Sequence, residues 1–161
     1  MGLRDTIDAA RETSLFVEQM MPRAIERLAT IEAAAPVKKA AELMSKPHTD
    51  LLVVCGKDGA MSGVLTKTDI VGYVGQCNGA GCMARVDTIM TGAVVFCRPE
   101  DALQNVWASM KKSGLQRIPV LDPKRRPIGI IYARDALQCL LGAVESDEAL
   151  LRDYVMSVGY Q

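Results

Sequence analysis

The sequence predicts an α+β fold made of two copies of one unit, each of which reads strand, helix, strand, strand, helix. A shift of 66 residues aligns the phrase Gly63-Val64-Leu65-Thr66-Lys67-Thr68-Asp69 with Gly129-Ile130-Ile131-Tyr132-Ala133-Arg134-Asp135. The same shift aligns two sets of apolar residues spaced i, i+3, i+4, i+7, which is the period of a helix face. It also aligns the strand-sized runs 51–54 and 117–120. The duplicated order predicts that the chain is an internal repeat.

We expect the first copy to span residues 17–75, after an N-terminal extension (1–16) that carries a short polar helix at 3–14. Pro36 suits the first position of a helix, and Gly56-Lys57-Asp58-Gly59 is a tight-turn sequence. The expected elements are a strand at 29–33, a helix at 36–46, strands at 50–55 and 61–65, and a helix that begins near Thr66.

A linker rich in glycine and cysteine (76–85) separates the copies, and we expect the second copy to span residues 86–141. Its opening segment, Val86-Asp87-Thr88-Ile89-Met90-Thr91, is similar to Val17-Glu18-Gln19-Met20-Met21-Pro22 at the start of the first copy. A C-terminal helical extension follows at 142–161, with a helix of its own at 145–156. The expected elements of the second copy are a strand at 93–97, a helix at 100–112, strands at 116–121 and 127–131, and a helix from Ala133.

Composition and charge exclude several classes of function. The 161 residues carry 19 basic and 19 acidic side chains, so the net charge is zero, and the basic footprint of a nucleic-acid-binding protein is missing. Aromatic residues make up only 4% of the chain, which is few for a base-stacking surface. No apolar run is long enough to span a membrane. With five cysteines and no export signal, we expect a cytoplasmic protein without a disulfide framework.

The two glycine-to-aspartate phrases, the segment 86–91 and Ile118-Pro119-Val120-Leu121-Asp122 together resemble the tandem cystathionine-β-synthase (CBS) domain pair, or Bateman module, over roughly residues 17–141. The resemblance implies two halves related by a pseudo-two-fold axis, with helices packed on small sheets, and a homodimer. It also implies a regulatory sensor and not an enzyme. Its ligand would be an adenine nucleotide (AMP, ADP, ATP, NAD or an S-adenosyl compound) in the cleft between the halves, with no required cofactor and an unknown effector protein downstream.

The phrase from Thr66 to Asp69 has two interpretations. Thr66 at a helix N-cap with an acid three residues later is a capping box, in which each side chain bonds the other residue's backbone N–H. The same geometry suits a ligand, because a carboxylate accepts hydrogen bonds from the vicinal hydroxyls of a ribose. A helix N-terminus also attracts phosphate. The resemblance assigns the ribose to Asp69 and the ribose or phosphate to Thr66, and Lys67 supplies a positive charge.

In the second copy Tyr132 replaces the threonine, so the capping box cannot form there, and Asp135 is favoured as a ligand residue. Arg134 is either a bidentate phosphate donor or a solvated surface arginine. The Tyr132 ring either fills the ligand volume or stacks on an adenine. By resemblance, the adenine would be lined by Ile31 and Val53 in one site and by Phe96, Ile118 and Pro119 in the other, although each of these residues is also compatible with an ordinary core.

Two alternatives to the nucleotide sensor remain open. The substitutions at Tyr132 and Val53 would fit a dimeric interaction scaffold whose ligand sites have degenerated. Cys77 and Cys82, in the glycine-rich linker, would fit a thiol redox switch. A metal site is not expected, because zinc needs three or four ligands and the chain contains one histidine.

Overall fold

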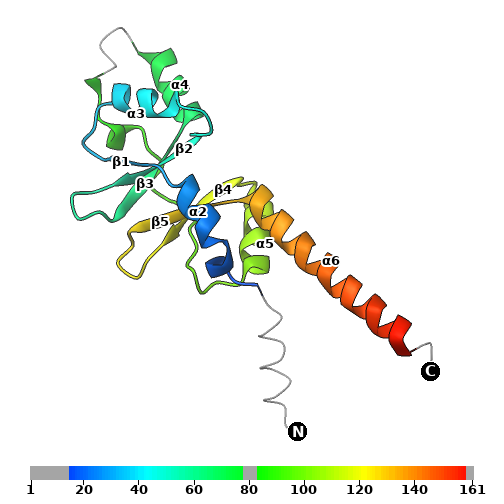
Figure 1. Cartoon of the computed structure of the whole chain (residues 1–161). Helices are drawn as coiled ribbons and strands as arrows, with labels where there is room; N and C mark the ends of the chain where they lie inside the picture. The colour runs from blue at the N-terminus through cyan, green and yellow to red at the C-terminus, as the bar shows by residue number, and fades with distance from the viewer. Residues whose placement is uncertain (1–14, 78–82, 159–161) are drawn as a thin grey trace.

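The computed structural model describes residues 15–77 and 83–158 and contains both predicted copies (Figure 1). The predicted helix at 3–14 and the residue Cys82 lie outside these ranges. The first copy consists of η1 (Val17–Met20), α2 (Met21–Arg27), β1 (Thr30–Glu32), α3 (Val37–Met44), β2 (Leu51–Cys55), β3 (Met61–Thr66) and α4 (Lys67–Gln76). The second consists of η3 (Val86–Thr88), α5 (Leu103–Ser113), β4 (Arg117–Leu121), β5 (Pro127–Tyr132) and α6 (Ala133–Val158).

Two small sheets carry the helices, so the predicted α+β class is confirmed. In the first copy β1 pairs with β2 in parallel and β2 pairs with β3 in antiparallel. In the second copy β4 pairs with β5 in antiparallel. A core of apolar side chains lies between the two sheets and joins the copies. It consists of Leu51, Val53, Met61, Leu121, Ile130 and Tyr132, all of which are buried.

The predicted strand at 93–97 is wrong, since only Cys97 pairs there, through a single parallel bridge to Val120. In the first copy the N–H of Val53 donates to the carbonyl of Ala29 at 2.9 Å and holds the incoming strand. Pro119 stands at the equivalent position of the second copy and has no N–H to donate. The segment ahead of Cys97 therefore cannot be held in the same way.

The copies exchange their opening segments, which the sequence did not predict. Val17, Met20 and Ala24, from the start of the first copy, lie in the core of the second copy. Val86, from the start of the second copy, lies in the core of the first. Figure 1 shows the same exchange, because α2 lies among the second copy's β5, β4 and α5. Neither core is complete without residues from the other copy.

The first glycine of each repeated phrase lies where an exchanged segment crosses a strand. A Cβ atom on Gly129 would lie 2.9 Å from the Cβ of Ala24 on α2, and one on Gly63 would lie 2.5 Å from the carbonyl oxygen of Thr91. Both distances are shorter than side-chain contacts allow. The repeated glycine thus marks the same crossing in both copies.

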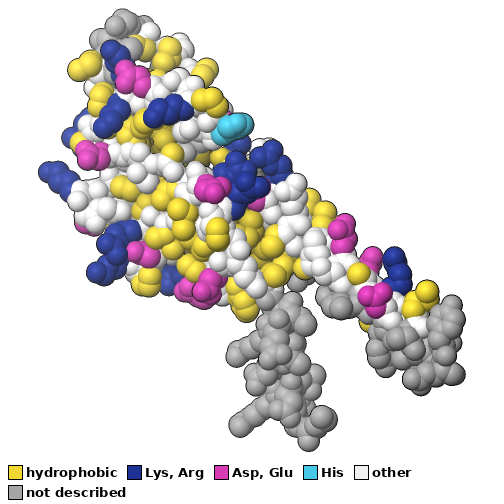
Figure 2. Space-filling view, viewed as in Figure 1, with side chains coloured by type: hydrophobic (Ala, Val, Ile, Leu, Met, Phe, Trp, Pro, Cys, Tyr) yellow, Lys and Arg dark blue, Asp and Glu magenta, His cyan; other side chains and the backbone are white. Residues whose placement is uncertain are grey.

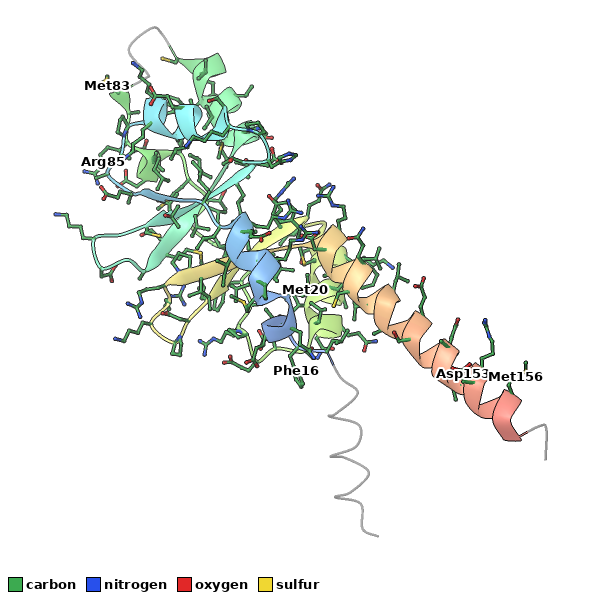
Figure 3. The ribbon with its side chains drawn as sticks, viewed as in Figure 1. Phe16, Met20, Met83, Arg85, Asp153 and Met156 are labelled. Carbon is green, nitrogen blue, oxygen red and sulfur yellow. The ribbon has the colours of Figure 1, made fainter. Side chains whose placement is uncertain are left out.

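Two helices run further than predicted. Helix α4 continues through Gln76, the first residue of the predicted linker. The separate helix predicted at 145–156 is the continuation of α6, a single helix of 26 residues, because residues 141–145 contain no proline to end it. Its far end, with Asp153 and Met156, extends away from the two sheets (Figure 3). Within the described ranges no helix is long and apolar enough to cross a bilayer.

Candidate ligand-binding pockets between the two copies

Two pockets lie between the copies, and each takes its residues from both. The larger, which we call the Thr66 pocket, has a volume of about 880 Å³. The smaller, which we call the Arg27 pocket, has a volume of about 280 Å³. Asp50, Gln116 and Arg117 line both pockets and separate them.

The two pockets are related by the internal repeat. Thr66, Lys67 and Thr68 line the Thr66 pocket, and the aligned residues Tyr132, Ala133 and Arg134 line the Arg27 pocket. The loop before β4 contributes Gly114 and Gln116 to the first, and the aligned loop before β2 contributes His48 and Asp50 to the second. Each pocket therefore combines the repeated phrase of one copy with a loop of the other.

At the Thr66 pocket the predicted capping box is present. The hydroxyl of Thr66 accepts a hydrogen bond from the backbone N–H of Asp69 at 3.3 Å. One carboxylate oxygen of Asp69, Oδ2, accepts from the backbone N–H of Thr66 at 2.9 Å and from its hydroxyl at 3.0 Å. No described group donates to the other oxygen, Oδ1. Asp69 itself does not line the pocket, so its geometry fits the capping role and leaves one oxygen available.

The remaining lining of the Thr66 pocket contains both charged and apolar residues. The charged residues are Lys67, Asp50 and Arg117. The apolar side chains come from β2, β3, the segment 93–95, the loop before β4, and β4 itself, and they are Leu51, Val64, Val94, Val95, Leu115 and Pro119. A pocket that offers both kinds of residue suits a ligand that has an apolar part and an anionic part.

Asp50 is the central charge between the pockets. Its Oδ1 lies 3.0 Å from Nζ of Lys67, and its Oδ2 lies 3.0 Å from Nη2 of Arg117. The hydrogen bond from Lys67, helped by the charge of Arg117, lowers the pKa of Asp50 below its ordinary value. Asp50 therefore stays ionised and offsets one of the two positive charges of Lys67 and Arg117, which leaves one for an anionic ligand.

In the Arg27 pocket the predicted ligand residues of the second copy are already engaged. Asp135 is buried and pairs with Arg27, whose Nε and Nη2 both lie 3.2 Å from Oδ2. The Tyr132 ring is also buried. The guanidinium carbons of Arg27 and Arg117 lie 4.2 and 4.8 Å from its centroid. Two arginines therefore already cover the ring, and its role toward a ligand, whether it fills the ligand volume or stacks on an adenine, stays a prediction.

The exchanged segments explain why the two pockets differ. The segment that enters the smaller pocket is the end of α2, which carries Arg27. The corresponding segment in the larger pocket is 93–95, which forms neither a helix nor a strand and carries only Ala and Val side chains. A long cationic side chain thus occupies one pocket, and short apolar side chains leave the other open.

The structure disperses the other predicted lining residues. Ile31 is buried in the core of the first copy, and Val53 is buried between the sheets. Phe96 and Ile118 line a third, shallower hollow beside α5. Only Pro119 lies in the Thr66 pocket. Arg134 is exposed at the edge of the Arg27 pocket.

Sequence reasoning missed Arg27, Asp50 and Arg117, which carry most of the charge in the two pockets. Arg27 lies outside the repeated phrases, and nothing in the sequence indicates that α2 crosses to the second copy. Asp50 and Arg117 stand at the starts of β2 and β4. The sequence indicates only that both residues lie next to the repeated apolar runs. It does not indicate that Asp50 and Arg117 pair with each other across the pseudo-two-fold axis.

The cysteines differ in their surroundings. Burial raises the pKa of the Cys97 thiol to about 12, and its Sγ donates to the carbonyl of Pro119. Burial also raises the pKa of Cys55. Cys77 is half-buried and ends α4, and the thiol pair predicted with Cys82 stays a prediction because Cys82 lies outside the described residues.

Fold and pockets together define a tandem-repeat module with two pseudo-symmetric pockets between its copies. The chain belongs to the CBS domain family, because the sequence model of the CBS domain matches residues 17–76 and again residues 86–142. The resemblance predicted from the sequence is thereby confirmed.

Solved structures share this architecture. The CBS-domain-containing protein ATU1752 from Agrobacterium tumefaciens is 24% identical, with a TM-score of 0.64 over 76% of this chain and 91% of that one. The CBS domain pair of protein MJ0100, solved with 5′-methylthioadenosine and S-adenosyl-L-methionine, is 22% identical, with a TM-score of 0.66 over 80% and 97%. At these identities the likeness shows the fold.

Curated relatives are much longer proteins. A homoserine O-acetyltransferase from Methanococcoides burtonii is 30% identical over 111 residues, which are 68% of this chain and 22% of the relative. An L-aspartate semialdehyde sulfurtransferase from Methanocaldococcus jannaschii is 24% identical over 106 residues, or 66% and 20%. The chain spans about a fifth of the length of these relatives, and their activities belong to the whole proteins.

Proposed function

We propose that the chain is a regulatory sensor module that binds one adenine nucleotide, of the AMP, ADP, ATP, NAD or S-adenosyl type, in the Thr66 pocket. It acts by ligand binding and not by catalysis. The observation that carries the proposal is the asymmetry between the pockets. The Thr66 pocket is about 880 Å³ and has apolar and charged lining residues, whereas Arg27 and Tyr132 narrow its counterpart to about 280 Å³.

The lining of the Thr66 pocket supports a nucleotide in particular. Val94, Val95 and Pro119 offer an apolar surface for the base. Thr66 offers a hydroxyl at the start of α4, where backbone N–H groups favour phosphate. Asp69, which does not line the pocket, orients that hydroxyl from behind it. Lys67 is half-exposed, so its ammonium group can leave Asp50 for a phosphate.

The proposed mechanism is linkage between ligand and the arrangement of the copies. The Thr66 pocket takes its residues from both copies, so a bound nucleotide stabilises the relative position in which they fit it. The shift is limited to the difference in affinity between the two arrangements. We propose that this shift is read by an effector protein or by the second chain of a homodimer in the cytoplasm. Sedimentation velocity that shows only a 17.4 kDa species would contradict the dimer.

A thermal-shift screen tests the nucleotide. At about 100-fold excess over Kd, a ligand adds about 2.7 kcal/mol to the free energy of unfolding, which for a chain of this size raises the melting temperature by roughly 5–11 °C. We expect one of the five nucleotide types to do so. Isothermal titration calorimetry should then give one nucleotide per chain.

Two matched substitutions locate the site. Val95→Trp places an indole in the Thr66 pocket from a partly exposed position and should abolish the thermal shift. Val71→Trp makes the same change on the exposed face of α4, outside the pocket, and should keep it. If no nucleotide shifts the melt of the unmodified chain, the sensor proposal fails. The dimeric scaffold is then the better account, because Arg27 already holds Asp135, the predicted ribose ligand of the second copy.

A further inference from the structure

The Arg27 pocket combines a cationic excess with a volume about a third of that of the Thr66 pocket. The charged residues that line it are Arg27, Arg117, Arg134 and Asp50. Two more charged residues lie outside the lining and pair with these: Asp135 with Arg27, and Lys67 with Asp50. In a chain whose net charge is zero, this is a local excess of two positive charges. Figure 2 shows Lys and Arg side chains gathered beside the histidine, between the two copies.

Two of the arginines have donors to spare. Among the described residues Arg134 forms no ion pair, and it is exposed at the pocket edge. Arg117 donates Nη2 to Asp50, but its Nε is buried without a hydrogen-bond partner. A guanidinium group carries five N–H donors in a planar fork, which matches the oxygens of phosphate. The buried Nε of Arg117 is out of reach of a ligand, so the free donors that the pocket offers are those of Arg134, together with the unbalanced charge.

The same pocket suits a nucleoside poorly, because the side chains that would hold one are already engaged. Its volume is about 280 Å³, against about 880 Å³ for the Thr66 pocket. The ring of Tyr132, the larger of the two aromatic rings in its lining, is covered by two guanidinium groups, so a base cannot stack on it without displacing one. Asp135, which the family resemblance assigns to ribose, is held by Arg27. What remains suits a small anion.

We propose that the Arg27 pocket is a separate site for a free, small oxyanion of the phosphate class, bound by Arg134 and Arg117 beside His48. The site lies next to the proposed nucleotide pocket and shares the wall of Asp50, Gln116 and Arg117 with it. It does not depend on a nucleotide being bound. Because the binding energy is largely electrostatic and near the surface, affinity should fall as salt is added.

Calorimetry with inorganic pyrophosphate tests the site on the full chain at low ionic strength. We expect one pyrophosphate per chain. Arg134→Gln should weaken binding about tenfold, the value of one hydrogen bond to a charged group. Arg152→Gln, an exposed arginine near the far end of the same helix, should change the affinity less than about twofold, as a remote screened charge would. Arg134→Lys keeps the charge and loses the planar fork of donors, so its affinity for pyrophosphate should lie between those of the other two variants.

Adenosine, which carries no phosphate, separates this site from the nucleotide site. We expect pyrophosphate to bind equally well when adenosine is present, and Val95→Trp to leave pyrophosphate binding intact. The proposal is overturned if pyrophosphate gives no binding up to about 10 mM, where a millimolar site would be mostly filled. It is also overturned if Arg134→Gln and Arg152→Gln weaken binding equally, or if adenosine displaces pyrophosphate. Failure of adenosine alone to bind would count against the nucleotide site and not against this one.

Discussion

Arg27 determines how the two pockets differ, although it belongs to neither repeated phrase. Its guanidinium pairs with the buried carboxylate of Asp135 and covers the ring of Tyr132. Only 17% of the Arg27 side chain and 7% of Asp135 are exposed, so water cannot replace either partner well. A charge left alone in such a place is costly, because the folded state has already removed most of its solvation.

Arg27→Ala should therefore lower the free energy of unfolding by about 3 kcal/mol, the lower end of the range for breaking a buried pair. The matched control is Arg126→Ala, which breaks the pair with Asp122, where half of the arginine is exposed, and should cost less than about 1 kcal/mol. Urea denaturation measures both. A double-mutant cycle with Asp135→Asn should give a coupling of about 1–3 kcal/mol. Additive losses would show that the pair is not the source of the stability.

At the scale of elements, the exchange of opening segments explains the two glycines that made the repeat visible. Helix α2 lies against β5 at Gly129, and the turn after η3 lies against β3 at Gly63. The sequence showed the glycines as part of a motif. The structure shows that each one lets another segment approach the strand, a role that no other residue type can fill without moving the backbone.

Gly63→Ala and Gly129→Ala should each lower the free energy of unfolding by about 1–3 kcal/mol, the cost of overpacking a close contact. Gly142→Ala is the control, because that glycine lies inside α6 and a Cβ added to it would meet no atom within 4 Å. It should raise stability by about 0.5–1 kcal/mol, since alanine favours a helix. Chemical denaturation of the three variants is the measurement. If Gly142→Ala lowers the free energy of unfolding as much as the other two variants, the close approach of the crossing segments is not the cause of their instability.

Most elements could be predicted because their signals are local. The turn 56–59 and the helix start at Thr66 depend on residues next to them in the chain. The strand at 93–97 was wrong because its partner carries Pro119, a residue that matters only once the two are paired. The pockets were harder still. Arg27 meets Asp135 across 108 positions of sequence, and Asp50 meets Arg117 across 67, and neither contact follows from any local pattern.

At the scale of the whole molecule, the exchange makes each copy depend on the other. The core of the second copy contains Val17 and Ala24, and the core of the first contains Val86. All three side chains are at most 1% exposed, so a copy that lost them would be left with a cavity. A small domain rarely has enough stability to tolerate that. The two sheets also share one core, which neither copy can bury alone.

The chain should therefore unfold in one cooperative transition, although it contains two copies of one unit. Scanning calorimetry should give a calorimetric enthalpy equal to the van't Hoff enthalpy, which is the mark of a two-state process. A fragment of residues 15–77 should stay unfolded by itself and regain structure when mixed with residues 83–158, because only together do they contain both opening segments. Two separate transitions, or a folded isolated copy, would mean that the exchanged segments do not hold the halves together. Val17→Ala extends the test, because it truncates a side chain of the first copy that lies in the core of the second. It should lower the melting temperature of the whole molecule, which should still unfold in a single transition.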